Sequence, residues 1–189
     1  SITGALSSLQ EESPALSVTA RRHLVDNARD EAERLNRLVG NLLDMTRLEA
    51  GAVRIQARPV DVEDLVGAAL EPLRNVLRDQ PVRVDLPPDL PPVAGDFVLL
   101  AQVLVNLVDN AVKYSPPGTP IELRAQAEGE RVTLTVADHG SGIPPADLAH
   151  IFDKFYRVQR PRGVAGTGLG LSICRGIIEA HGGRIWAEN

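Results

Sequence analysis

The sequence of 189 residues has little of several features that mark particular classes of protein. A single cysteine, Cys174, excludes an internal disulfide framework and a multi-cysteine metal site. No apolar run approaches the length needed to span a bilayer, and Ser1 does not open a signal peptide. The net charge is -5 and the arginines are spread among acidic residues, so nucleic acid is not an expected partner. A globular chain with 43% hydrophobic residues remains, long enough for two modules.

The N-terminal part of the chain has the pattern of long helices. Proline is absent from residues 17–49, and Gly40 is their one glycine. The last four regularly spaced apolar residues of this stretch are Leu35, Leu38, Leu42 and Met45. They step by 3, 4 and 3, which is the spacing of a coiled-coil seam. Residues 1–10 have a similar pattern that EESP interrupts, so we predict the tail of a first helix, a turn and a long second helix.

This helical hairpin is expected to occupy residues 1–51, and a second domain residues 52–189. Each helix of a lone hairpin leaves its apolar stripe half covered, so two hairpins would associate into a four-helix bundle and make a homodimer. The alternative is a solvated helix with charged residues on both sides of the stripe.

From residue 52 onward the pattern changes to short elements. The predicted strands are residues 53–58, 82–86, 121–127, 132–138 and 182–189. The predicted helices run from a cap at Asp61 to about residue 77, from a cap at Asp96 to residue 115, and over residues 169–180. Residues 87–95 are expected to form a proline-rich loop. Strands and helices mix without strict alternation, which favours an α+β fold with helices layered on one face of a sheet.

One predicted helix carries a polar stripe on an otherwise apolar surface. Its members are Gln102, Asn106, Asn110 and Lys113, at spacings of 4, 4 and 3. Two buried asparagines alone would indicate an internal hydrogen-bond network. The lysine one turn further on favours a different site, because an amide oxygen suits Mg²⁺ and an ammonium group attracts phosphate. The stripe therefore points to a metal-nucleotide site.

Two glycine-containing segments extend this hypothesis. Asp138 ends a predicted strand, and a carboxylate suits an exocyclic amine such as that of adenine, whereas it repels phosphate. The segment GVAGTGLGLSI precedes a helix, where free backbone amides favour phosphate. Each motif alone is weak, because an Asp-Gly turn explains the first and the second matches neither a dinucleotide fold nor a P-loop.

Taken together, four motifs in their order and spacing resemble the conserved boxes of the bacterial sensor histidine kinases. QVLVNLVDNAVKYSP resembles the asparagine box, DHGSGIP and GTGLGLSI the two glycine boxes, and IFDKFYRV the phenylalanine box. The hairpin, which ends in NLLDMTRLEAG, resembles their dimerisation and phosphotransfer domain. Within this family, SITGALSSL and ICRGIIEAHGG are most similar to the potassium-sensing KdpD kinases.

The resemblance implies an ATP-binding α/β sandwich of the type shared by histidine kinases, gyrases and chaperones, the Bergerat fold. In it Asn110 would bind Mg²⁺, Asn106 would meet metal and phosphate during catalysis, and Lys113 would contact phosphate. Asp138 would hold the adenine amine, and Arg157 would offset charge on the transferred phosphoryl group. The other implied nucleotide-binding residues border the base or form the glycine boxes: Tyr114, Gly140, Gly142, Gly166, Thr167, Gly168, Leu169 and Gly170.

The phenylalanine box would support a mobile lid. Phe152 and Phe155 are expected to anchor the lid to the sheet by packing, with Tyr156 near the phosphates. The lid itself, residues 159–164, would be short.

The phosphorylated histidine of the family lies on the first helix in an H-[DE]-x-R-x-P motif, which none of the four histidines follows. The sequence begins just after the expected place, so we expect the acceptor upstream of Ser1. His23, His139, His150 and His181 are expected to be surface or packing residues. The last strand is likewise expected to be truncated, because the family continues with at least one more.

The expected function is the cytoplasmic kinase core of a two-component sensor, tied to the inner membrane only through segments outside this sequence. The histidine would receive phosphate from ATP and pass it to a response-regulator receiver domain. A related ATPase is one alternative, but it needs a glutamate base where this chain has Asn106. A non-catalytic dimeric adaptor with a vestigial pocket is the other, against which Asn110 and Asp138 argue.

Overall fold

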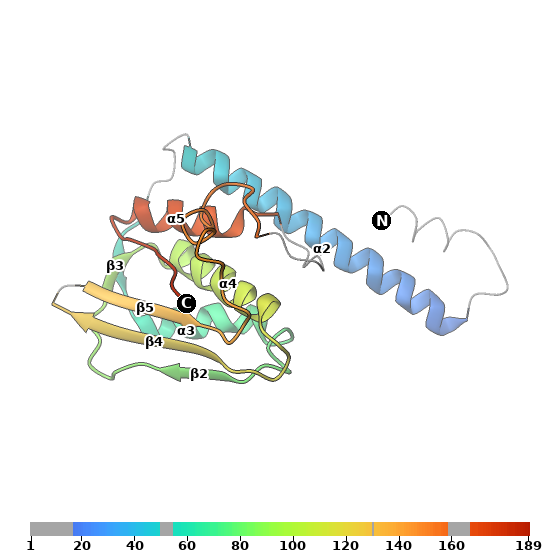
Figure 1. Cartoon of the computed structure of the whole chain (residues 1–189), viewed down its shortest axis with the longest axis horizontal. Helices are drawn as coiled ribbons and strands as arrows, with labels where there is room; N and C mark the ends of the chain where they lie inside the picture. The colour runs from blue at the N-terminus through green and yellow to red at the C-terminus, as the bar shows by residue number, and fades with distance from the viewer. Residues whose placement is uncertain (1–16, 50–54, 130, 159–166) are drawn as a thin grey trace. The chain divides into compact units, whose positions relative to one another are not determined.

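The computed structural model describes residues 17–49, 55–129, 131–158 and 167–189 (Figure 1). The chain divides into two compact units, Ser1–Thr46 and Arg47–Asn189. The predicted helix in residues 1–10, the predicted boundary between residues 51 and 52, and the predicted lid of residues 159–164 lie outside the described residues or within their gaps. These three features therefore stay predictions.

The long helix of the first unit is α2, Val18–Glu49. Ser17 caps its start, because its Oγ accepts a hydrogen bond of 3.1 Å from the Ala20 amide. The predicted helix of residues 17–49 is thus confirmed. Large apolar side chains of α2 are exposed by 41 to 53%: Val25, Leu35, Val39, Leu42 and Leu43. Met45 is buried, and the Leu38 side chain lies outside the described part.

The first helix that lies wholly within the second unit is α3, Val62–Leu70, and it is capped. The Asp61 carboxylate accepts hydrogen bonds from the amides of Glu63 and Asp64, as the sequence predicts. The predicted extension to about residue 77 is wrong. A 3-10 turn, η1, Glu71–Leu73, follows the α-helix, because Pro72 has no amide hydrogen to continue the helical hydrogen bonds.

A three-stranded sheet forms one side of this unit, in the order β2-β4-β5. Its strands are β2, Val82–Asp85, β4, Ile121–Glu128, and β5, Arg131–Ala137. β2 runs parallel to β4, and β4 and β5 form the predicted antiparallel hairpin. Along β4 every second residue at its start, Ile121, Leu123 and Ala125, is buried, so one face of the sheet supplies the core.

A second, two-stranded sheet pairs β1, Arg58–Val60, with β3, Val93–Gly95, in antiparallel fashion. The predicted strand of residues 53–58 was placed too early, because pairing with the short β3 fixes where β1 lies. The predicted proline-rich loop of residues 87–95 likewise contains strand β3, which the sequence pattern does not indicate. Both errors concern a pairing between segments far apart in the sequence.

The predicted strand of residues 182–189 is wrong. Gly182, with φ of +72°, closes the turn after the last helix, and residues 183–189 have no regular secondary structure. A strand needs a backbone partner. The contact that this segment makes at its end uses instead the Asn189 side chain, which hydrogen-bonds the backbone of Ile143.

Two further helices complete the described part of this unit (Figure 1). α4, Phe97–Tyr114, packs on α3 and on β4 and β5, and α5, Gly170–Ala180, packs on α4. The Asp96 carboxylate caps α4 through the amides of Val98 and Leu99, as predicted. Helices layered on one face of a mixed sheet confirm the predicted α+β class.

Of the helices in the described residues, α4 is the one long and apolar enough to cross a membrane by length and composition. This differs from the sequence analysis, which expects no apolar run of that length. Leu104 and Val108 of α4 belong to the hydrophobic core together with Leu65 of α3 and Leu123 of β4. Core packing therefore accounts for the apolar character of this helix.

Candidate functional site

α4 carries the predicted polar stripe, with Gln102, Asn106 and Asn110 partly buried. The Asn106 Nδ2 atom is buried and makes no hydrogen bond of ordinary geometry among the described residues, although the side chain lies within reach of the Cys174 sulfur, a weak acceptor. Buried amide groups are normally paired, so this donor is suited to an acceptor that the chain alone does not supply. Phosphate oxygens are acceptors of that kind.

Beside Asn106 lies the one cysteine of the chain, Cys174 of α5. Its side chain is buried, and its Sγ is 3.7 Å from the Val103 carbonyl oxygen, to which it donates. Burial raises the pKa of this thiol to about 12, against a smaller lowering influence of the Asn106 amide. The residue packs α5 against α4, and too little of its thiol is ionised at neutral pH for it to act as a nucleophile.

Lys113 was predicted to contact phosphate. Its ammonium group forms an ion pair with Asp109, one helical turn earlier on α4. Both side chains are partly exposed, and ion pairs of this kind contribute little to stability. A phosphate group could therefore compete with Asp109 for this ammonium at small cost.

The first glycine box begins where β5 ends. The Asp138 Oδ1 atom accepts a hydrogen bond of 2.7 Å from the Gly140 amide, and the carboxylate is exposed. A Cβ atom added at Gly140 would lie 2.6 Å from the Tyr114 carbonyl oxygen, so no larger residue fits there. The end of α4, which carries Tyr114, thus meets the loop that carries Asp138.

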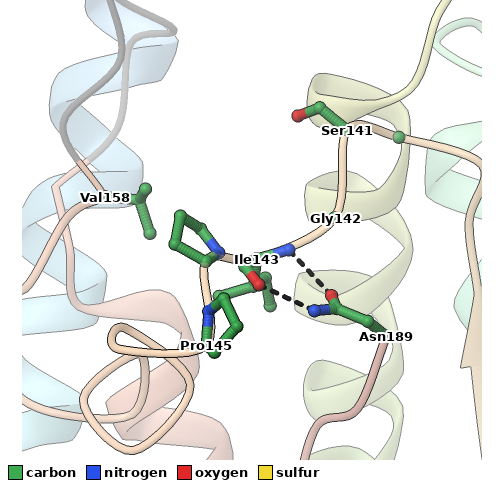
Figure 2. Close-up of a pocket in the computed structure, with 8 residues that line it drawn as sticks. Ser141, Gly142, Ile143, Pro145, Val158 and Asn189 are labelled. Atoms are coloured by element: carbon green, nitrogen blue, oxygen red, sulfur yellow. Dashed lines mark hydrogen bonds between the residues drawn. The ribbon is translucent and has the colours of Figure 1, made fainter.

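A pocket of about 600 Å³ lies against this loop (Figure 2). Its lining residues come from the first glycine box, the phenylalanine box and the end of the described chain: Gly140, Ser141, Gly142, Ile143, Pro144, Pro145, Val158 and Asn189. Gly142 has φ of +68°, a conformation that favours glycine. No sequence pattern indicates Val158 or Asn189, because each reaches the pocket through a contact between distant segments.

The phenylalanine box packs through its backbone as well as its side chains. Phe152 is buried, as expected for an anchor, but the Phe155 side chain is 66% exposed, so its predicted anchoring role is wrong. Phe155 has φ of 61°, and its amide donates a hydrogen bond of 2.9 Å to the Gly168 carbonyl oxygen. A Cβ atom added at Gly168 would lie 2.7 Å from the Phe155 carbonyl carbon. The second glycine box thus lies directly against the phenylalanine-box backbone.

The remaining predicted site residues have varied surroundings. Arg157 is exposed, and Gly166 lies outside the described residues. The Thr167 hydroxyl accepts a hydrogen bond of 3.3 Å from the Leu169 amide, and the Leu169 side chain is buried. Gly170 begins α5 and has open space where a Cβ atom would be. Leu169 could therefore meet a ligand only through its backbone.

Tyr156 was expected near phosphates, and its hydroxyl donates a hydrogen bond to the Asp147 carboxylate. This bond raises the pKa of the Tyr156 phenol above its usual 10.0, with burial and the negative charges of Asp147 and Asp153 acting in the same direction. The neutral phenol is the form that the fold stabilises.

We expect the Asp147→Asn substitution to lower the pKa of Tyr156 towards 10.0, because the charged acceptor is lost. A raised pKa in the folded state contributes stability that is present below pH 10.0 and is lost as the pH rises through the folded pKa. The measurement is phenolate absorbance against pH, and Tyr156→Phe assigns the signal, since the chain has 2 tyrosines. An unchanged Tyr156 titration in Asp147→Asn would contradict the hydrogen bond as the cause.

The residues of the site fit Mg²⁺ and a nucleotide better than a metal ion held by the protein alone. Among the described residues, no group of three or more His, Cys, Asp or Glu side chains could hold a metal ion. A metal here would depend on an amide oxygen and on the ligand itself, which suits Mg²⁺ and Asn110, because Mg²⁺ keeps several waters and shares phosphate oxygens. The Asn106 donor fits a phosphate-bearing ligand, whereas Gly140 and Gly168 allow the close packing of the protein's own backbone around the site.

Two family models match the chain. The histidine kinase-, DNA gyrase B-, and HSP90-like ATPase family matches residues 95–189. The His Kinase A (phospho-acceptor) domain matches residues 1–51.

Curated relatives agree with these matches. The chain is 43% identical over 153 residues to the sensor protein KdpD of Escherichia coli, covering 81% of this chain and 17% of that protein. It is 38% identical over 194 residues to the adaptive-response sensory kinase SasA of Synechococcus elongatus, covering 98% of this chain and 50% of that protein. The chain therefore spans half or less of the length of these relatives.

A solved structure shares the fold. Full-length ShkA in complex with AMPPNP superposes with a TM-score of 0.74 at 30% identity, covering 94% of this chain and 37% of that one.

Proposed function

Because this chain belongs to the sensor histidine kinases, we propose that it is the dimerising and ATP-binding core of a protein-histidine kinase. The observation that carries the proposal is the meeting of α4 with the first glycine box. Gly140 lies close to the Tyr114 carbonyl, so the C-terminal end of α4, one turn beyond Asn110, meets the loop that begins at Asp138. That arrangement supports one ligand with a base at Asp138 and phosphates towards the stripe.

Each proposed contact uses an atom that the fold leaves accessible or unpaired. The Asp138 carboxylate holds the Gly140 amide through Oδ1, and its other oxygen accepts the adenine amine. Asn106 donates its unpaired amide hydrogen to a phosphate oxygen, and Asn110 offers its amide oxygen to the metal. Bound Mg²⁺ would neutralise part of the phosphate charge.

The cationic residues complete the proposed contacts. Lys113 exchanges Asp109 for a phosphate group, and Arg157 offsets the charge that develops on the transferred phosphoryl group. The glycine-box residues at positions 140, 142, 166, 168 and 170, together with the Thr167 and Leu169 backbone, would enclose the nucleotide. The protein thus acts by positioning and by charge.

We propose that the phosphoryl acceptor is a histidine outside these 189 residues. His181 hydrogen-bonds the Asp96 amide and the Ile177 carbonyl oxygen, and His150 pairs with Asp153. His139 lies 3.6 Å from Glu122, and His23 is exposed on α2. The first three already have structural contacts, and none of the four stands in the motif of the family.

Hydrolysis of ATP to drive a conformational change is less well supported. Such ATPases need a base one turn before the metal residue, and the amide of Asn106 cannot accept a proton at neutral pH. The proposal extends to a receiver domain as the final phosphoryl acceptor, to a membrane anchor outside this sequence and to the potassium stimulus that resemblance to the KdpD group implies. These steps rest on the relatives, not on the geometry.

The experiment that tests the proposed kinase activity is labelling with radioactive ATP. We expect the 189-residue chain to bind ATP and to remain unlabelled, whereas a longer chain that includes the upstream helix acquires acid-labile label. Label on the longer chain should fall in Asp138→Asn, because an amide NH₂ facing the adenine amine costs about 1 to 3 kcal/mol. Acid-labile label on the 189-residue chain that disappears in His23→Gln would contradict the acceptor assignment, and a longer chain that binds ATP without labelling would favour the adaptor.

We expect Leu42→Glu to convert a dimer into a monomer in sedimentation. The Leu42 side chain is 46% exposed on α2 in the single chain, and a dimer would bury it among other apolar residues. A buried leucine contributes about 1.5 to 3 kcal/mol, and an unpaired carboxylate at the same place costs more. Asn36→Glu, at an exposed polar position on the same helix, is the control and should leave the dimer intact. A dimeric Leu42→Glu chain would place the interface elsewhere.

A further inference from the structure

Asn189 makes two hydrogen bonds to one residue of the pocket loop. Its Oδ1 atom accepts from the Ile143 amide at 2.8 Å, and its Nδ2 atom donates to the Ile143 carbonyl oxygen at 2.7 Å. Figure 2 shows both bonds side by side at the edge of the pocket. An amide side chain offers one donor and one acceptor in this arrangement, so Asn189 pairs with Ile143 as a neighbouring strand would.

The position next to Ile143 is shaped around this amide. Gly142 has φ of +68°, and a Cβ atom added there would lie 3.1 Å from the Asn189 Oδ1 atom. Any side chain at Gly142 would therefore press on the acceptor that holds the Ile143 amide. The pairing and the glycine conformation depend on each other.

The loop between β5 and the phenylalanine box is thus held at two points. At its start, Asp138 bonds the Gly140 amide, and Gly140 lies against the Tyr114 carbonyl. At Ile143, the Asn189 amide bonds both backbone polar groups. Pro144 follows at once and has no amide hydrogen to offer. Without Asn189, the backbone of Ile143 would have to satisfy its hydrogen bonds with water.

We propose that Asn189 is a positioning residue of the nucleotide site. It fixes Ile143, and through Ile143 the turn at Gly142, so that the loop beside Asp138 already has its binding conformation before the nucleotide arrives. The inference rests on the proposed function, since it assigns Asn189 a role in that same site. Its benefit is preorganisation, because a loop that is already ordered loses less entropy on binding.

The first measurement is hydrogen exchange at the Ile143 amide without nucleotide, followed by NMR. Asn189→Ala should exchange faster at Ile143 than the unchanged chain does. Asn189→Asp should keep the Ile143 amide bonded to a carboxylate oxygen, while it turns a second oxygen towards the Ile143 carbonyl. Glu188→Ala, at the exposed neighbouring position, is the matched control and should leave the exchange unchanged.

The second measurement is calorimetric affinity for ATP and for ADP. We expect Asn189→Ala and Asn189→Asp to weaken the binding of ATP and of ADP by the same factor, because the loop lies on the base side of the site. The factor should be only roughly three- to tenfold, because these hydrogen bonds are exposed. Thermal unfolding should change little, which separates positioning of the loop from loss of the fold.

The outcomes separate this inference from the proposed function. If the wild-type chain binds neither ATP nor ADP, both the positioning role of Asn189 and the proposed function are overturned. An unchanged chain that binds ATP, together with an Asn189→Ala chain of equal affinity, would overturn the positioning role alone. Full affinity in Asn189→Asp would show that the bond to the Ile143 carbonyl is not needed, and so would overturn the paired arrangement.

Discussion

Replacement of Gly168 by alanine is expected to lower the free energy of unfolding of the second unit by about 2 to 4 kcal/mol. Gly168 has φ of +71°, where an alanine is strained, and the new Cβ atom would lie 2.7 Å from the Phe155 carbonyl carbon. That carbon belongs to a backbone already at φ of 61°, so it has little freedom to retreat. Urea unfolding measures the loss.

Two other glycines separate the causes of this loss. Gly129 has φ of +62° but nothing within 4 Å of an added Cβ atom, so Gly129→Ala should show the conformational strain alone, about 1 to 2 kcal/mol. Gly67 lies inside α3 with the same open space and no unusual φ, so Gly67→Ala should stabilise by about 0.5 to 1 kcal/mol. If Gly168→Ala costs no more than Gly129→Ala, the close contact with Phe155 is unimportant.

The second large effect is expected from Asn110→Ala, which should weaken binding of Mg-ATP at least about tenfold, or about 1.4 kcal/mol. The side chain would supply the protein oxygen that fixes the metal, and water can replace this oxygen without fixing the position. Calorimetry with and without a chelator distinguishes this role. The loss should be large with Mg²⁺ and small without it.

The control for Asn110→Ala is Gln126→Ala, which removes an exposed amide from β4, away from the polar stripe of α4. It should bind Mg-ATP as the unchanged chain does. Equal losses in Asn110→Ala with and without Mg²⁺ would assign Asn110 to the nucleotide and not to the metal. No loss at all would remove Asn110 from the site.

Features that depend on a few neighbouring residues could be predicted from the sequence. Asp61 and Asp96 precede helices and cap them, and Gly129 turns the hairpin of β4 and β5. The stripe on α4 follows from helical spacing, which brings Asn106 and Asn110 to one side of the helix. In each case the interaction spans about one turn of chain.

Features that depend on contacts between distant segments could not be predicted from the sequence. β1 lies where β3 allows it, and the segment after α5 ends in a side-chain contact with Ile143 instead of a strand. Phe155 is exposed and its backbone lies against Gly168, a contact between distant segments that no pattern around Phe155 encodes. The ion pair between Asp109 and Lys113, by contrast, spans one helical turn, so helical spacing alone could have predicted it.

The buried thiol of Cys174 can report how often the contact between α5 and α4 opens. With a thiol pKa of about 12, on the order of one molecule in 10⁵ carries the reactive thiolate at pH 7, and the sulfur is covered by α4. Alkylation of the native chain must therefore wait for α5 to separate from α4. Because the Asn106 amide lies beside this sulfur, the rate of alkylation reports how often α5 separates from α4 next to the polar stripe, and no engineered label is needed.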